Sequence, residues 1–447
     1  MNVTLTLLAW PLIAMVAFKI FAPRSAVLFV LLGGWLLLPV GIYPPDASFS
    51  AFPYWLIGAA LPSDMLITKA WVAPASALLG AVFLDRQRLR RHRFNAWDLP
   101  MALWCLWPLL QWALRPDAQP APMLACAYLL GSWGFTWLLG RLYFGSHEDQ
   151  SALLHGLAWA CLACVPFSVL EGVSAPDLYA SLYEPHPFAS DGASRYLGWR
   201  PIGFFEHGNQ YGLWVCLCAL AALWVWRSRV AEQRASWWGW GAMAVCGMAL
   251  LAQSVGALLL LGVGLAVLTL MARVRLQTLW VITLCVSFLG GAVYLSGVVP
   301  ITQLGKDTAI GRKVVEVFKA TGRGSFTWRI SQDQKAIDLV KSTALVGHGH
   351  WDWWKSLNTR PWGLALLLVG QYGLIGLLCA FGALLAPAAL CLWRAPVASP
   401  WQLSGAPVIL ATIVVLTIMD AGLNSFIFFP ALMAAGALVP RAKAIGA

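Results

Sequence analysis

Thirteen long apolar runs follow one another along the chain and hold few polar residues. Each is close to the ~20 residues with which a helix crosses the hydrocarbon core of a bilayer. The runs lack the alternation of apolar and polar residues that lipid-facing strands show. Helices are therefore expected, because lipid offers the backbone no other hydrogen-bonding partner within a segment. The runs cover about 3–22, 25–43, 66–84, 98–114, 119–140, 151–171, 208–226, 236–253, 255–271, 277–298, 362–392, 402–419 and 424–439.

Composition agrees with this pattern. Apolar residues make up 60% of the chain and charged residues 11%, whereas soluble proteins carry roughly a quarter charged residues. The mean hydropathy is +0.71. We therefore predict an all-α, polytopic integral membrane protein with one transmembrane domain over residues 1–447 and twelve or thirteen transmembrane helices. Twelve is the count if one short run only dips into the membrane. The segment from Met1 to Thr6 has no basic n-region or cleavage site, so it is expected to begin the first span.

The net charge of +11 comes mainly from basic residues dispersed among short loops. Such a distribution favours topology signals and contacts with anionic lipid over binding of nucleic acid. Five arginines between positions 86 and 93 mark one loop as cytoplasmic. Counting outward from that loop places every other short basic loop on the same side. Two long polar segments, 171–209 and 300–361, then lie on the outer side of the membrane.

The second of these segments carries ten Lys and Arg residues, against the usual positive-inside tendency. Long loops are translocated regardless of charge, so these residues favour a folded element that holds an anion. Residues 311–319 and 328–346 are amphipathic, which predicts helices on the membrane surface or over a cavity. In the second helix, Asp333 is expected on the polar face, opposite Ile337 and Val340.

A dense polar cluster precedes the run at 208–226. An arginine at such a boundary presents a planar fork of donors that matches phosphate oxygens. Near the outer end of the third run, Lys69 is a further candidate, although an interfacial anchor is the simpler account. The residues proposed for substrate binding in this cluster are Arg200, Glu206, His207 and Asn209.

The second long segment adds Arg323, Arg329 and Arg360 as anion contacts. His348 and His350 titrate near neutral pH, so either could act as general base for a sugar hydroxyl. The nearby tryptophans could stack on sugars, but an aromatic belt at the headgroup level is the preferred interpretation; they are Trp351, Trp353, Trp354 and Trp362.

No metal site or cofactor is expected. A metal at the His-x-His pair would lack a third and fourth ligand beyond Asp352. The ten cysteines lie within apolar runs, and Cys161 and Cys164 form a lone CxxC in the middle of one run. Small apolar packing residues explain them better than a metal or redox site does.

The two long segments resemble the O-antigen ligase and polymerase superfamily of bacterial envelope glycosyltransferases. RPIGFFEHGN, from Arg200 to Asn209, is similar to the family's R-x-x-G-x-x-x-x-x-N segment. TGRG from position 321, followed by Trp328 and by LVGHG from position 345, is similar to its periplasmic S/T-G-R, W and L-x-G-x-G run. GLIG from position 373 matches the family's closing G-x-x-G. The resemblance covers residues 195 to 380.

Two departures bear on the mechanism. The family's histidine, its proposed catalytic base, is replaced by Trp362, and the Ser-Arg-Gly of many members is Ser-Val-Gly around Val255. The remaining candidates for the catalytic position are His348, His350 and Arg360. The departures favour an exopolysaccharide or capsule polymerase over a lipopolysaccharide ligase.

The resemblance implies an inverting, metal-independent glycosyltransferase. Its donor would be a glycan on undecaprenyl pyrophosphate, its acceptor another glycan or a lipid, and its active face periplasmic. Two alternatives stay open: a transporter of a glycan, lipid or small anion, and a catalytically inactive relative acting as a scaffold. Transporters place ionisable groups near the bilayer midplane, whereas the spans of this chain are almost free of charge.

Overall fold

The computed structural model describes residues 1–43, 66–118, 120–174, 178–183, 194–195, 197–232, 237–274, 278–299, 301–320, 324–357, 361–394 and 400–440. Within these ranges a helix lies on each of the thirteen apolar runs, which confirms the all-α prediction. The helices of these runs are α1 (Val3–Ile20), α2 (Pro23–Leu37), α3 (Lys69–Leu84), α5 (Leu99–Leu114), α6 (Pro122–Leu129) continued by the π-helix η3 (Leu130–Gly134) and α7 (Phe135–Tyr143), α8 (His147–Ser174), α10 (Gly208–Ala231), α11 (Trp238–Leu251), α12 (Val255–Val274), α13 (Thr278–Ser296), α17 (Leu364–Arg394), α18 (Ala406–Asp420) and α19 (Phe429–Leu438).

The other elements are short or polar. β1 and β2 form an antiparallel pair that sets Ser194 opposite Trp199 and Arg195 opposite Gly198. The remaining elements are α4 (Arg86–Arg91), η2 (Ala96–Asp98), α9 (Leu178–Leu182), β1 (Ser194–Arg195), β2 (Gly198–Trp199), α14 (Ile301–Asp307), α15 (Ala309–Ala320), α16 (Gly324–Lys341), η4 (Lys355–Leu357) and η5 (Leu403–Gly405).

Several helices are long and apolar enough to cross a bilayer, so the chain is a multi-pass membrane protein. Seven helices of the described residues meet this test, and an eighth is added if α13 and α14, which meet at 91°, count as one broken span. Four shorter apolar helices, α2, α3, α11 and α19, lie among them. A helix of this length covers less than the ~30 Å hydrocarbon core. The full count of twelve or thirteen crossings therefore stays a prediction.

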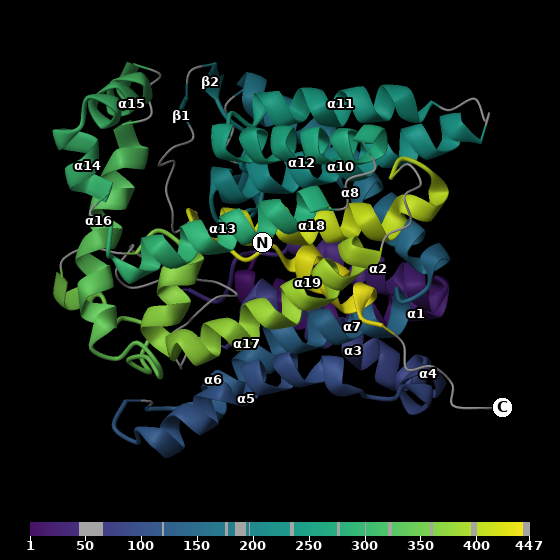
Figure 1. Ribbon diagram of the computed structural model, residues 1–447. Coiled ribbons are helices and arrows are strands. Elements are labelled where there is room, and N and C mark those ends of the chain that lie inside the picture. Colours follow the sequence, from purple (N-terminus) through teal and green to yellow (C-terminus); the bar gives the residue numbers. More distant parts are fainter. Residues whose placement is uncertain are drawn as a thin grey trace.

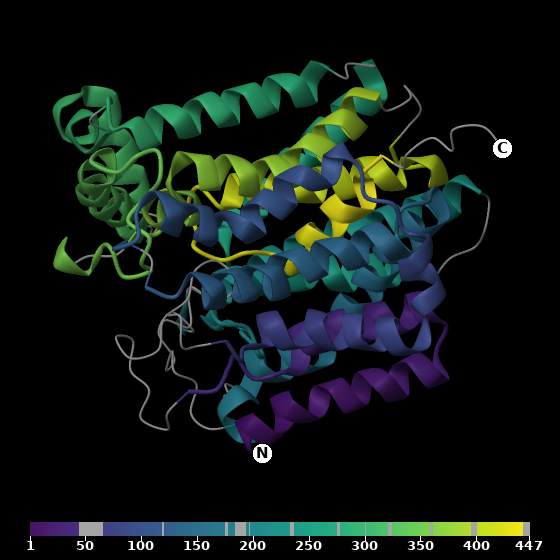
Figure 2. The ribbon, with the colours of Figure 1, turned by 90° about the horizontal axis from the view of Figure 1, so that it is seen from below.

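The apolar helices lie alongside one another, and polar elements occupy the two ends of the bundle (Figure 1, Figure 2). α14, α15 and α16 gather beyond one end, whereas the arginine-rich α4 lies near the other. The second long polar segment thus lies at the opposite end of the bundle from the basic loop, as counting the spans predicts. We call the end with α14–α16 the polar-helix end and the opposite one the α4 end.

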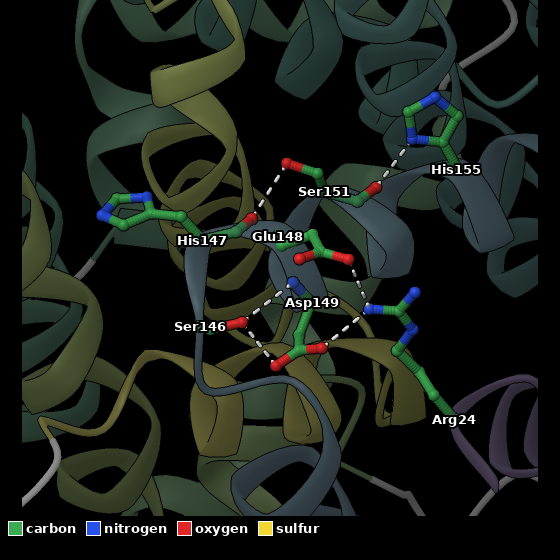
Figure 3. Close-up of polar contacts among 7 residues, drawn as sticks. All are labelled: Arg24, Ser146, His147, Glu148, Asp149, Ser151 and His155. Atoms are coloured by element: carbon green, nitrogen blue, oxygen red, sulfur yellow. Dashed lines mark hydrogen bonds and ion pairs between the residues drawn. The ribbon is translucent and has the colours of Figure 1, made fainter.

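At the α4 end, ion pairs join helices that are distant in sequence. Arg141 of α7 lies 3.1 Å from Asp98, and both side chains are buried. In Figure 3, Arg24 from the first turn of α2 reaches Asp149 at 2.8 Å and Glu148 at 3.6 Å. The two acids stand in the first turn of α8, where the helix dipole also favours negative charge.

Two glycines allow α7 and α19 to cross closely in this part of the bundle. A Cβ at Gly140 of α7 would collide with the backbone of Met433, and one at Gly436 of α19 would collide with Trp137. Small residues let helices in lipid approach closely enough for dense van der Waals contact, which drives their association. The sequence at these positions therefore brings α19 directly against α7.

The helices of the second polar segment match the prediction in part. α15 includes the expected 311–319, and α16 begins four residues before Trp328 and ends at Lys341. The prediction that Asp333 lies on the polar face of α16 is wrong. Its side chain is 3% exposed and lies on the same buried face as Ile337 and Val340. Its carboxylate is turned inward because other elements donate hydrogen bonds to it.

Candidate functional site

A buried carboxylate holds the first polar loop against the polar-helix end of the bundle. Glu171, near the end of α8, is 2% exposed, and its Oε2 accepts the backbone N–H groups of Ile202 (3.1 Å) and Gly203 (2.9 Å). This part of the loop is therefore tied to α8 by two backbone hydrogen bonds. Arg200 lies just before this anchor and is 1% exposed. His207 then caps α10, its Nδ1 accepting the backbone N–H of Asn209 (3.0 Å).

The two long polar segments meet in a set of hydrogen bonds that we call the arginine–asparagine network: Arg200, Asn209, Arg329, Asp420 and Asn424. Arg200 donates to Asn209 Oδ1 at 3.1 Å, and Asn209 Nδ2 donates to Asn424 Oδ1 at 3.3 Å. Arg329 donates to that same oxygen at 3.3 Å. Asn424 Nδ2 in turn donates to Asp420 at 2.7 Å. Three segments that are far apart in sequence thus place two guanidinium groups at one end of the bundle.

Arg329 is supported from a second side. Its Cζ lies 4.5 Å from the ring centroid of Trp362, a cation–π contact. One turn along α16, Asp333 accepts the backbone N–H of Trp362 and the hydroxyl of Tyr294, both at 2.7 Å. Burial raises the pKa of Asp333 to about 6. Burial, together with the nearby positive charge of Arg195, lowers the pKa of Arg329.

Lys69 and Glu206 form a separate buried ion pair beneath the first loop. Lys69 Nζ lies 3.3 Å from Glu206 Oε1 and donates to the backbone oxygen of Phe204 at 2.7 Å. It also lies over the rings of Trp35 (5.2 Å) and Phe205 (5.5 Å). Both charged side chains are 1% exposed. The expectation of Lys69 as an interfacial anchor is therefore wrong, because Glu206 compensates its charge away from the surface.

A small cavity adjoins this ion pair. Its volume is about 20 Å³, and Trp35, Lys69, Phe429 and Met433 contribute to its mostly apolar wall. This volume is close to that needed for one water molecule. A lipid or sugar does not fit there without movement of the surrounding helices.

The histidine-bearing segment 344–349 lies beside a break in α17. Leu374 N donates to the oxygen of Ala344 at 2.7 Å, and His348 N donates to that of Gly370 at 2.8 Å. The break is at Gly373, with φ +73°, and a Cβ there would collide with the backbone of Leu345. L-residues with side chains rarely adopt such angles. The LVGHG and GLIG parts of the sequence are thus in direct backbone contact.

The end of α5 anchors the same segment. Gln111 Nε2 donates to the backbone oxygens of Val346 and Gln371, both at 2.7 Å, and Arg115 donates to that of Gly347 at 2.8 Å. The contacts that fix the backbone of this segment are therefore with α5 and α17. Those that fix Arg200 and Asn209 are with α10 and the residues after α18.

The two histidines differ in environment. The His348 ring is stacked on Trp353, with 5.6 Å between centroids and 3° between planes. Burial, with smaller contributions from His350 and Arg115, lowers the pKa of His348. His350 is exposed, and its Nδ1 lies 3.0 Å from Asp352 Oδ1. His348 therefore has the more enclosed position, and burial favours its neutral form.

The remaining predicted residues include two arginines that the structure does not describe and two tryptophans that lie elsewhere than expected. Arg323 and Arg360 lie outside the described residues, so their predicted roles stay predictions. The aromatic-belt interpretation is wrong for Trp353 and Trp354, which are 3% and 7% exposed and pack inside the fold. Among the described residues, no group of three or more His, Cys, Asp or Glu side chains is arranged to hold a metal.

Sequence reasoning missed Asp333, Asp420 and Asn424. Asp420 directly follows the apolar run at 402–419, and Asn424 begins the next run one helical turn later. An ionisable residue at the place of Asp420 is a functional candidate by default. That signal was available in the sequence. For Asp333 no sequence signal was available, since only its partners from α13 and from the start of α17 reveal its buried position.

Comparison of the chain with protein families, with curated proteins and with solved structures gives no match. The resemblance of its motifs to O-antigen ligases and polymerases therefore stays a prediction. What the site does must be proposed from its own geometry.

Proposed function

We propose that this protein is an inverting, metal-independent glycosyltransferase of the bacterial inner membrane. It transfers or polymerises glycan from undecaprenyl pyrophosphate onto an acceptor sugar at the periplasmic face. The arginine–asparagine network supports this proposal most strongly. It gathers Arg200 and Arg329, two of the arginines that the sequence alone suggested for a phosphate group, from segments more than a hundred residues apart.

In the proposed reaction, an acceptor hydroxyl attacks the anomeric carbon of the donor sugar. The bond between that carbon and the pyrophosphate oxygen breaks, and the lipid pyrophosphate leaves with both electrons of the bond. Arg200 and Arg329 hold the pyrophosphate and stabilise the charge that grows on it. The hydroxyl proton passes to a base, for which His348 and His350 are the candidates. No redox step or cofactor is needed, since the pyrophosphate linkage already activates the sugar.

The test is turnover by the full-length protein in nanodiscs. Lipid-linked glycan from the native host is the donor, and free undecaprenyl pyrophosphate is measured. Removing one preorganised contact to developing charge costs about 10²–10³ in rate. We expect a loss of that size for Arg200→Ala and Arg329→Ala. Lys335→Ala is the matched control, because Lys335 is an exposed cation on the same helix as Arg329. Wild-type turnover in a well-folded Arg200→Ala, Arg329→Ala double variant would refute the proposal.

One observation favours the transporter alternative, namely the buried Lys69–Glu206 pair. Ionisable residues inside a bundle often mark a transport pathway. The same assay separates the two functions, because a transporter binds the lipid-linked glycan but releases no undecaprenyl pyrophosphate. Release that depends on the two arginines excludes transport as the sole function.

A further inference from the structure

The second polar segment contains a helix whose surface the proposed reaction does not use. On α15, Ile310 is 79% exposed, Val314 47% and Val317 57%. These residues are four and three positions apart, so they form one stripe along the helix. A stripe of this kind in water exposes apolar area without compensation.

The rest of α15 has two other faces. Gly311 and Val315 lie toward α14, since a Cβ at Gly311 would collide with α14 and the Val315 side chain lies next to Gly305. Arg312, Lys313 and Glu316 are exposed on the remaining side. With a helical repeat of 3.6 residues, Lys313 lies directly beside the apolar stripe. The helix therefore has a packed face, an exposed apolar stripe and a charged flank.

The position of this helix relates it to the bilayer. α13, the apolar helix before it, exposes large apolar residues such as Phe288 (60%) and Leu289 (67%), as a lipid-facing helix does. α14 then turns by 91° from α13. A right-angle turn at the end of a helix that runs along the membrane normal sends the next helix along the membrane plane. α14 and α15 lie together beyond that end of the bundle (Figure 1, Figure 2).

Charge indicates the kind of surface that α15 contacts. Lys306, Arg312 and Lys313 are exposed in α14 and α15, against Asp307 and Glu316. Lys313 is the cation directly beside the apolar stripe, whereas Arg312 lies on the opposite side of the helix and donates to the backbone oxygens of Lys306 and Asp307 at 3.1 Å. An apolar stripe with a cation at its edge matches anionic phospholipid, with the stripe in the acyl boundary and Lys313 among the headgroups. We propose that the exposed stripe of α15 inserts into the outer surface of the membrane that the bundle spans and binds anionic phospholipid there. The second polar segment is thereby held flat on the bilayer next to the arginine–asparagine network.

The test uses photo-crosslinking of the full-length protein in nanodiscs of phosphatidylcholine with or without phosphatidylglycerol. A benzophenone amino acid replaces Ile310 or Val314 on the stripe, and Arg312 or Glu316 on the charged side as the matched control. We expect lipid adducts by mass spectrometry at the two stripe positions and few at the control positions. Phosphatidylglycerol adducts should exceed phosphatidylcholine adducts. Lys313→Gln should reduce that preference roughly fivefold, from the typical contribution of one basic residue near an anionic surface.

Other results would overturn the proposal. Adducts from the stripe to the protein's own chain would mean that it covers part of the fold. Adducts to a second copy would mean a subunit interface, and equal lipid adducts at all four positions would mean no defined orientation. Because crosslinking does not depend on turnover, this test is independent of the proposed transferase activity.

Discussion

The buried Lys69–Glu206 pair gives a quantitative test of how this bundle is held together. Replacing Lys69 by Met leaves the Glu206 carboxylate buried without its cation. The amine also loses its 2.7 Å bond to the oxygen of Phe204 and its contact with Trp35. Breaking a buried ion pair in this way costs about 3–5 kcal/mol, because an uncompensated charge stays in a region of low dielectric. Glu206→Gln, which leaves the ammonium group unpaired, should cost a similar amount.

Replacing both partners should cost much less than the sum of the single changes. Desolvation of two charges largely cancels their attraction, so exchange of a buried pair for neutral side chains is often close to neutral. We expect the Lys69→Met, Glu206→Gln double variant to lie within about 2 kcal/mol of wild type. The coupling energy of the double-mutant cycle would then be about 4 kcal/mol or more.

Equilibrium unfolding in mixed micelles, followed by tryptophan fluorescence, measures these free energies. The control is the exposed pair Asp338–Lys341, at 2.7 Å on α16 and with side chains 77% and 51% exposed. Its coupling should be below about 1 kcal/mol. Single variants at Lys69 and Glu206 that cost under 1 kcal/mol, or costs that simply add, would show that the reasoning about this pair is wrong.

Three further predictions concern the polar-helix end. Because the pKa of Asp333 is raised from 3.8 to about 6, folded protein binds more protons than unfolded protein between these values, and stability falls as pH rises. Wild type should thus lose about 2 kcal/mol between pH 4 and pH 6 relative to Asp333→Asn, and parallel pH–stability curves would contradict this. Gly373→Ala should destabilise the protein by about 2 kcal/mol or more in thermal unfolding. Gly382→Ala in the same helix, where a Cβ would meet no other atom within 4 Å, should have little effect. Equal effects of the two changes would refute the role of the positive φ at Gly373. Trp362→Leu removes the aromatic face beneath Arg329 and should slow glycan transfer about fivefold to thirtyfold. Trp362→Phe keeps an aromatic face and should retain most activity. Equal rates for the Leu and Phe variants would rule out the cation–π support.

Much of the fold follows directly from the apolar runs. Lipid forces each run to satisfy its own backbone hydrogen bonds, so the pattern alone predicts thirteen helical segments. Their ends follow less well: the run at 25–43 gives a helix that stops at Leu37, and the run at 424–439 gives one that starts only at Phe429. The length of a helix decides whether it can cross a bilayer. Because an apolar run does not reveal where its helix ends, the runs alone do not predict which helices are long enough.

The sequence could predict only those contacts of the candidate site that join residues close to each other along the chain. Arg200 and Asn209 are nine residues apart, and the cap at His207 brings them together. The bond from Arg329 to Asn424 joins positions 95 residues apart, and no pattern in either segment indicates it. The amphipathic pattern of α16 misplaced Asp333 for the same reason, since hydrogen bonds from other elements can stabilise a buried carboxylate.

The residue at position 362 bears on the proposed mechanism. Its backbone N–H is bound by Asp333 and its ring lies against Arg329, so this position supports a cation and has no group that can accept a proton. In the proposed transfer, the acceptor proton must therefore go elsewhere. Both oxygens of Asp333 already accept hydrogen bonds from the protein and its side chain is 3% exposed, so this carboxylate is poorly placed to reach an acceptor hydroxyl. His348 is held rigidly by backbone bonds to α17, and its lowered pKa keeps the imidazole neutral at pH 7, the form that accepts a proton. Between the two histidines, the mechanism therefore favours His348 over the exposed His350.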